Sequence, residues 1–327
     1  EYLTFDSRLT LEIIKTSISN KANAINYCKV NKLLKTNNKI IGVLCKDLQT
    51  DISFKIYAKH VINASGPWVD KICKLDSITL PKNICHSLGI HIVVDKNILP
   101  INNSIYFNVD DGRMCFAIPM ENVTYIGTTD TIYSGDIDKL EIIEKDIEYI
   151  INAINKAFNI KKLLKSDIIS AWAGLRPLIY KQNKNTSELS RKDEMFVSDS
   201  GLITIAGGKL TGYRLMAKKV VDKICKQEHI NYNCITENLQ LIGSEFSKTL
   251  TINKYCEIIY QNLIDCNLDK STAKYLVNTY GSQAEKVLTI FKQNSYTYLI
   301  EAEAFFSLMY ENTYTLLYFF FIITCNF

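Results

Sequence analysis

LITIAGGKLT, residues 202–211, runs from an apolar segment through two glycines into a helix-forming segment. This order predicts a strand, a tight turn and a helix. Gly207 and Gly208 would let the backbone press against a flat ring, and a helix start carries about half a positive charge. Lys209 adds a full charge. The pattern therefore favours a flat, electron-rich ligand, although a helix capped by Thr211 with no ligand is the alternative. The glycine spacing does not match a phosphate-binding P-loop.

A second strand–turn–helix pattern lies at NASGPWVD, residues 63–70, directly after the apolar end of a predicted strand. Gly66 would permit close approach of a ligand to the backbone, and the helix that follows would attract an anionic group. A tight turn with no ligand fits the same residues. For this motif alone, both interpretations stand.

Two arginines occur in segments where a charge needs a partner. In GLRPL, residues 174–178, Pro177 favours an extended backbone before it, and Arg176 stands among residues that we expect to be buried. A buried guanidinium requires an anionic partner, either a structural carboxylate or a substrate phosphate. Arg191 lies in SRKD, residues 190–193, which by itself is also typical of a surface salt-bridge cluster.

Polar residues interrupt two further apolar segments. His91 stands in SLGIHIVV, residues 87–94, on an otherwise apolar strand. A lone histidine there is more often a core residue than a catalyst. IGTTD, residues 126–130, ends a predicted strand with three polar side chains and is equally typical of a turn.

The composition is that of a soluble globular protein with one large or two medium domains. The 327 residues are 47% hydrophobic and 22% charged, with a net charge of +4. The positive charge is spread thinly, which argues against nucleic acid as a partner. We expect the short basic runs at residues 32–39 and 161–165 to be solvated loops.

Cysteine usage and the chain ends bear on location. The ten cysteines include no Cys-x-x-Cys pair, which disfavours a disulfide framework or a zinc site. We expect no metal, reduced thiols and a cytoplasmic location. The first residue is Glu1 and no signal peptide precedes the first motif, so we expect the true N-terminus to lie upstream. LLYFFFII, residues 316–323, is shorter than the about 20 residues of a membrane span; a buried helix end is favoured over contact with a membrane surface.

Hydrophobic periodicity predicts a mixed α/β chain followed by an all-helical end. A long helix is predicted over residues 138–158 and another after Thr211, and a domain boundary near residues 235–250. The predicted strands are residues 40–44, 54–64, 91–95, 114–119, 123–127, 168–173 and 202–206. The predicted C-terminal helices are residues 252–264, 271–279, 283–292 and 298–309.

Taken together and in this order, the motifs resemble those of the FAD-dependent glycerol-3-phosphate dehydrogenase and oxidase family, which is of the DAO type. The resemblance extends from about Asp6 to about Ala304. The segments that carry it are NASGPWVD, GIHIVV, DGRMCFAIPM, IGTTD, AGLRPL, ELSRKDE and GLITIAGGKLTGYR.

The resemblance implies a fold, a cofactor and a reaction. The implied fold is a partial FAD-binding domain with a substrate-cap sheet at residues 1–240 and a small all-helical domain at residues 241–327. The implied cofactor is FAD. The implied reaction oxidises sn-glycerol 3-phosphate to dihydroxyacetone phosphate and passes electrons to quinone. Location would be cytoplasmic, with peripheral contact at the cytoplasmic face of the membrane as an option.

The resemblance also implies residue roles. His91 is the candidate base, Arg176 and Arg191 are the candidate phosphate ligands, and Lys209 lies beside the flavin ring. Arg176 and Lys209 are counted with His91 as catalytic. The implied cofactor-binding residues are Gly66, Gly207, Gly208, Lys209, Leu210 and Thr211.

Some positions depart from the family pattern. None of the 13 glycines falls in the GxGxxG spacing that binds the ADP half of FAD. We therefore expect an N-terminally truncated member that purifies without stoichiometric FAD. Leu88 and Leu215 stand where relatives often carry lysine, and Ile322 and Ile323 where they carry arginines; the latter pair puts the last helix in doubt.

Three alternatives remain open at this stage. The oxidase of the same family would pass electrons to dioxygen. A non-catalytic remnant would retain the motifs without activity. An amine-oxidising relative such as a glycine oxidase is disfavoured, because Arg176 and Arg191 would then have no anion to bind.

Overall fold

The computed structural model describes six stretches of the chain: residues 4–77, 84–159, 161–179, 193–247, 249–294 and 298–310. The chain divides into two compact units. Unit 1 comprises Glu1–Leu34, Ile41–Lys59 and Cys225–Phe327. Unit 2 comprises Lys35–Ile40 and His60–Ile224.

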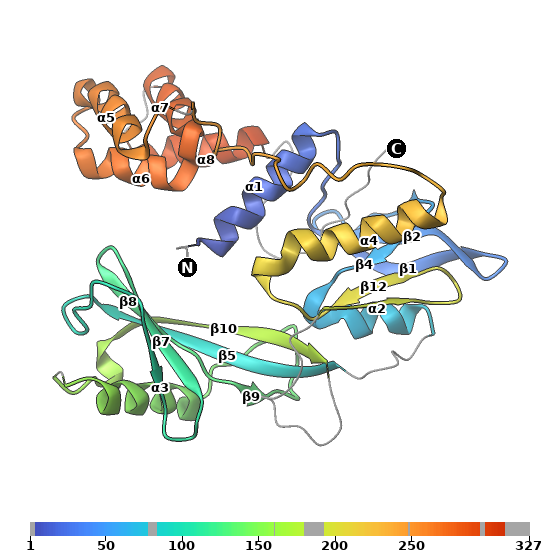
Figure 1. Ribbon diagram of the computed structural model, residues 1–327, viewed down its shortest axis with the longest axis horizontal. Helices are drawn as coiled ribbons and strands as arrows, with labels where there is room; N and C mark the ends of the chain where they lie inside the picture. The colour runs from blue at the N-terminus through green and yellow to red at the C-terminus, as the bar shows by residue number, and fades with distance from the viewer. Residues whose placement is uncertain are drawn as a thin grey trace. The chain divides into compact units, whose positions relative to one another are not determined.

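Unit 2 contains a six-stranded antiparallel sheet, here called the large sheet. Its order is β10-β5-β8-β7-β6, with β9 also paired to β5. The helix α3 (Glu144–Ala157) belongs to the same unit (Figure 1). The strands are β5 (Ile84–Asp95), β6 (Ile105–Asn108), β7 (Met114–Met120), β8 (Val123–Gly127), β9 (Thr131–Ile132) and β10 (Ile168–Ile179).

Side chains alternate between the two faces of β5, as in any strand. Ile90 and Ile92 are fully buried in one core cluster with Ile150 and Ile154 of α3. His91 points to the opposite face, because it lies between them in the sequence. The large sheet thus has a packed face toward α3 and a second face that carries polar residues, here called the site face.

A smaller sheet of unit 2 contains both strand–turn–helix motifs. Its order is β11-β12-β4, and β12 runs parallel to β4. Ile203 and Ile205 of β12 pack against Val220 and Ile224 of the helix that follows. The elements are β4 (Ile62–Asn63), η1 (Gly66–Trp68), α2 (Val69–Leu75), β11 (Glu194–Val197), β12 (Ile203–Ala206), η4 (Leu210–Gly212) and α4 (Tyr213–Gln227).

Unit 1 combines most of a three-stranded sheet, of order β1-β2-β3, with helices from both ends of the chain. Lys15 Nζ of α1 donates to Gln283 Oε1 at 2.7 Å, and Arg8 lies 5.0 Å from the ring centre of Tyr280, so α1 packs on the C-terminal helices. The elements are α1 (Asp6–Ser19), β1 (Cys28–Thr36), β2 (Lys39–Asp47), β3 (Ser53–Tyr57), α5 (Ile252–Leu263), α6 (Lys270–Tyr280), α7 (Ala284–Gln293) and α8 (Leu299–Tyr310). The remaining 3-10 turns are η2 (Lys165–Asp167), η5 (Ile264–Cys266) and η6 (Gly281–Gln283).

The fold class is confirmed as mixed α/β with a helical C-terminal region, and the four predicted C-terminal helices are observed within one or two residues. Three element predictions were wrong. The basic run at residues 32–39 lies in β1 and the start of β2, with the turn at Asn37 and Asn38, because Leu33 and Leu34 between its lysines are half-buried in β1. The predicted strand 54–64 is two strands, and the predicted helix 138–158 begins only at Glu144.

The apolar run at residues 316–323 lies outside the described stretches. Within those stretches, no helix combines the length and the apolar character needed to cross a membrane.

Candidate active site

The two most distinctive candidate residues lie on the same face of the large sheet. In the pairing of β10 with β5, Trp172 stands opposite His91, and Arg176 stands opposite Ser87. Gly174 and Gly89 form the pair between them. His91 and Arg176 therefore belong to the site face of neighbouring strands, four residues apart in register, with the pair of Gly174 and Gly89 between them.

The imidazole of His91 is held between aromatic rings. It stacks on Trp172, with ring centres 5.1 Å apart and planes at 17°, and lies 5.4 Å from the ring of Phe116. On β8, Gly127 stands opposite His91, and a Cβ at Gly127 would collide with the imidazole. A glycine at this position leaves the space that the ring occupies.

The guanidinium of Arg176 is held by the segment after β8. Its Nη1 donates to the carbonyl oxygen of Thr129 at 3.1 Å, and its Nη2 donates to Thr128 Oγ1 at 2.8 Å. Nη1 also lies 3.7 Å from Asp130 Oδ1. A Cβ at Gly89 would collide with this guanidinium. The anionic partner expected for a buried arginine is thus present, yet the side chain remains 28% exposed and accessible to a second anion.

Gly174 lies on the same face as His91 and Arg176. Among the described residues, no heavy atom lies within 4 Å of the position that its Cβ would take. The site face therefore has open space over Gly174, bordered by an imidazole and a guanidinium. A cation, a proton-accepting ring and open space suit a small anionic substrate with a hydroxyl to deprotonate.

The parallel pairing of β12 with β4 brings the two glycine turns to the same edge. Ile203 pairs with Ile62 and Thr204 pairs with Asn63, so both strands end side by side. Gly207 and Gly208 then turn with positive φ angles of 77° and 83°, which glycine adopts without strain. Gly66 also has a positive φ, of 56°.

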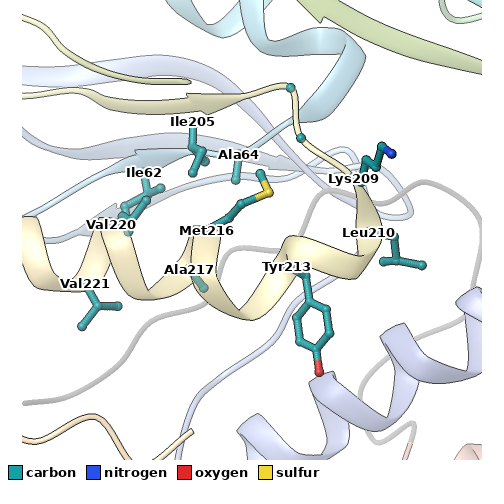
Figure 2. Close-up of a pocket in the computed structure, with 12 residues that line it drawn as sticks. Ile62, Ala64, Ile205, Lys209, Leu210, Tyr213, Met216, Ala217, Val220 and Val221 are labelled. Carbon is teal, nitrogen blue, oxygen red and sulfur yellow. The ribbon is translucent and has the colours of Figure 1, made fainter. Parts of the chain in front are cut away.

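A mostly apolar pocket of about 460 Å³ adjoins these turns (Figure 2). It is lined by side chains and backbone of β4, the turn after β12, and α4. Lys209 and Leu210 lie at its rim and are exposed. The lining residues are Ile62, Ala64, Ile205, Gly207, Gly208, Lys209, Leu210, Tyr213, Met216, Ala217, Val220 and Val221.

Thr211 does not cap the helix, contrary to the alternative weighed from the sequence. Residues Leu210–Gly212 form a 3-10 turn whose N-cap is Lys209, with no side-chain cap hydrogen bond. The α-helix begins at Tyr213. Thr211 is the middle residue of this 3-10 turn, and Gly212 separates it from the first residue of the α-helix.

A buried amide fixes the turn that contains Gly66. Asn63 Nδ2 donates to the carbonyl oxygen of Val69 at 3.0 Å, and Ser65 Oγ donates to Asn63 Oδ1 at 2.6 Å. His86 Nε2 lies at hydrogen-bond distance, 2.8 Å, from the carbonyl oxygen of Pro67. Since His86 is part of β5, the strand that carries His91 is linked directly to this turn.

The two ends of α2 differ in electrostatics. Burial raises the pKa of Asp70 in its first turn. Burial also acts to raise the pKa of Asp76 after its last turn, but hydrogen bonds from Lys35 and the nearby serines outweigh it and lower that pKa. Asp76 Oδ1 lies 2.5 Å from Lys35 Nζ, and Ser200 Oγ donates to Oδ2 at 2.5 Å. This paired carboxylate is a structural anchor for α2.

Arg191 lies outside the described residues. The sequence interpretation missed Trp172, Phe116 and the glycines opposite the candidate side chains. The alternation in AWAGLRPL already places Trp172, Gly174 and Arg176 on one face of a strand. Only the pairing of β10 with β5 shows that this face is shared with His91.

Comparison with known proteins places these features in a family. The family model for FAD dependent oxidoreductases matches residues 4–214. The chain belongs to this family. The match includes the glycine turn after β12 and the strands of His91 and Arg176, so the resemblance of the motifs is confirmed.

Individual relatives are glycerol-3-phosphate dehydrogenases. The chain is 41% identical over 292 residues to the aerobic glycerol-3-phosphate dehydrogenase of Bacillus subtilis (strain 168), which covers 88% of this chain and 53% of the relative. The Staphylococcus saprophyticus enzyme of that name is 39% identical over 303 residues, 90% of this chain and 54% of the relative. The structure of a glycerol-3-phosphate dehydrogenase from Bacillus halodurans complexed with FAD is similar, with a TM-score of 0.79 and 37% identity over 95% of this chain and 58% of that one. The chain thus spans about half the length of the relatives it matches.

Proposed function

We propose that this chain forms part of an FAD-dependent dehydrogenase that oxidises sn-glycerol 3-phosphate to dihydroxyacetone phosphate. The observation that carries the proposal is the site face of the large sheet, where His91 and Arg176 border the open space over Gly174. The relatives' names support the same substrate. A secondary alcohol that bears a phosphate offers its hydroxyl to His91 and its phosphate to Arg176.

The phosphate would bind to Arg176. A guanidinium presents forked donors that match phosphate oxygens, and such charge-assisted hydrogen bonds are stronger than neutral ones. Arg176 is partly exposed, so an incoming phosphate can reach it. Arg191 is proposed as the second phosphate ligand.

The substrate hydroxyl would lose its proton to His91. The ring's stacking on Trp172 and its contact with Phe116 limit its rotation, so a ring nitrogen can be held at a defined position. Removing the proton as the carbinol C–H bond breaks avoids the formation of a protonated ketone.

The residues of the glycine turns fit the ring end of FAD. Gly207 and Gly208 keep the chain free of side chains beside a mostly apolar pocket, and Lys209 with the helix start places positive charge near it. When bound, the flavin supplies the hydride acceptor. Gly66, Leu210 and Thr211 are the other proposed cofactor contacts, and Lys209 would stabilise negative charge during the reaction.

The proposed electron acceptor is the quinone pool, reached by peripheral contact with the cytoplasmic face of the membrane. The aerobic dehydrogenase names of the relatives support this choice over the oxidase. Quinone reduction measured against hydrogen peroxide formation tests it: peroxide as the main product would contradict it.

Substrate-dependent flavin bleaching tests the function itself. Under anaerobic conditions, glycerol 3-phosphate should bleach the flavin absorbance of the FAD-loaded, full-length protein that contains this chain, whereas glycerol and glycine should not. Bleaching by glycine, with no response to glycerol 3-phosphate, would assign the chain to an amine-oxidising enzyme. Unchanged absorbance with all three would favour a non-catalytic remnant.

A further inference from the structure

Three consecutive residues direct oxygen atoms at Arg176 from the end of β8. Thr128 contributes its hydroxyl oxygen and accepts a hydrogen bond at 2.8 Å, and Thr129 contributes its backbone carbonyl and accepts at 3.1 Å. Asp130 contributes a carboxylate oxygen at 3.7 Å. Thr128 and Thr129 therefore contact the guanidinium in addition to the carboxylate of Asp130.

The three residues are themselves fixed to β5. The hydroxyl of Thr129, which is 1% exposed, accepts from the backbone N–H of Ile90 at 3.0 Å and donates to the carbonyl oxygen of Leu88 at 3.3 Å. The hydroxyl of Ser87 donates to Asp130 Oδ1. A segment anchored at two points on β5 gives its remaining oxygens a defined position.

The space for the guanidinium comes from the same strand. Gly89 lies two residues after Ser87 and one before Ile90, and a Cβ there would collide with both terminal nitrogens of Arg176. Strand β5 therefore supplies both the open surface over which the guanidinium lies and the anchors of the segment that holds it. The hydrogen bond from Nη2 to Thr128 Oγ1, at 2.8 Å, is shorter than the contacts of Nη1 with Thr129 and Asp130.

We propose that Thr128, Thr129 and Asp130 form a clamp that holds the guanidinium of Arg176 in one orientation, and that the Thr128 hydroxyl is its positioning group. This inference rests on the proposed role of Arg176 as a phosphate ligand. An oriented fork binds two phosphate oxygens at a smaller entropic cost than a freely rotating one. Thr128 thus acts on substrate selection through Arg176, without touching the substrate.

The first test measures the orientation directly and needs no ligand. In protein with selectively labelled arginine, the Nη1–H and Nη2–H signals of Arg176 should be resolved from one another in the wild type, because the clamp slows guanidinium rotation. Thr128→Val keeps the shape and removes the acceptor, so these signals should merge; Thr128→Ser should restore them. Merged signals in the wild type, or unchanged ones in Thr128→Val, would overturn the clamp.

Thr124→Val is the matched control for this experiment. Thr124 lies on β8, four residues before Thr128, is fully buried, and donates its hydroxyl to the carbonyl oxygen of Leu99 at 3.1 Å. The substitution should lower stability and leave the Arg176 signals separate. If Thr128→Val does not fold, Thr128→Ala provides the same loss of acceptor without the added methyl, and the same outcomes apply to it.

The second test links the clamp to the phosphate. In the FAD-loaded protein, Thr128→Val should weaken glycerol 3-phosphate binding by about three- to tenfold and leave glycerol binding unchanged. In an Arg176→Leu background it should have no further effect, because the group that it positions is gone. Additive effects of the two substitutions would overturn the inference.

The outcomes separate this inference from the proposed function. If Arg176→Leu weakens glycerol 3-phosphate binding but Thr128→Val does not, the inference fails and the proposed function stands. If Thr128→Val frees the guanidinium but Arg176→Leu leaves glycerol 3-phosphate binding unchanged, Arg176 is not the phosphate ligand and the proposed function fails. The substrate-selection part of the inference then fails with it.

Discussion

The two faces of the large sheet differ in what their side chains do. On the face toward α3, β5 contributes aliphatic residues such as Ile90 and Ile92, which are fully buried. On the site face, the same strand contributes Ser87, Gly89 and His91. The isoleucines stabilise the sheet by burial. On the site face, Gly89 leaves the space that the guanidinium of Arg176 occupies.

Along one strand, residues that pack into the core alternate with residues that face the candidate active site. Strand β10 repeats the pattern, since Ala173 and Leu175 pack toward the core cluster, while Trp172, Gly174 and Arg176 belong to the site face. Substitutions one residue apart should therefore have different consequences.

The largest expected effect is on turnover at the site face. His91→Ala in the FAD-loaded enzyme should lower kcat by about 100-fold to 10,000-fold, the usual contribution of a general base, with a much smaller change in KM. Steady-state kinetics with glycerol 3-phosphate measure this. A kcat within experimental error of the wild type would show that His91 only packs against Trp172.

The neighbouring residue should behave in the opposite way. Ile92→Ala on the packed face should lower the free energy of unfolding by about 2 to 5 kcal/mol, because it leaves a cavity against α3. Denaturant unfolding of both variants gives the comparison. The folded fraction of Ile92→Ala should keep the wild-type KM; a changed KM at full folding would mean that the two faces are not independent.

A third substitution separates phosphate binding from folding. Arg176→Leu should weaken binding of glycerol 3-phosphate by about 1.5 to 3 kcal/mol, because a charge-assisted contact is lost. Binding of unphosphorylated glycerol, measured by calorimetry, is the control. An equal loss for both ligands would mean that Arg176 and Asp130 form a structural pair.

The smallest expected effect concerns the open space. Gly174→Ala adds a methyl group where the structure has no neighbour within 4 Å among the described residues, so stability should change by less than about 0.5 kcal/mol. Affinity for glycerol 3-phosphate should fall several-fold, because the methyl group enters the substrate's space. Gly89→Ala is the contrasting variant, since its Cβ would displace the guanidinium of Arg176 and should lower the affinity further; a wild-type affinity in Gly174→Ala would show that Gly174 does not face the substrate.

The sequence predicted the individual motifs better than their arrangement. The apolar run around His91 and the glycines of LITIAGGKLT are local patterns, and the strands they predict are observed within β5 and β12. The opposition of His91 to Gly127 and of Gly89 to Gly174 depends on strand pairing, which no local pattern specifies. The start of β5 at Ile84 was also missed, because the polar residues before Leu88 mask its period.

A side-chain NMR titration of the FAD-loaded protein with glycerol 3-phosphate tests most directly whether the substrate binds on the site face of the large sheet. We expect the ring signals of His91 and the guanidinium signals of Arg176 to shift, while the methyl signals of Ile90 and Ile92 do not. Glycerol should shift the Arg176 signals little. Shifts confined to the isoleucine methyls, or an equal response of Arg176 to glycerol, would contradict this expectation.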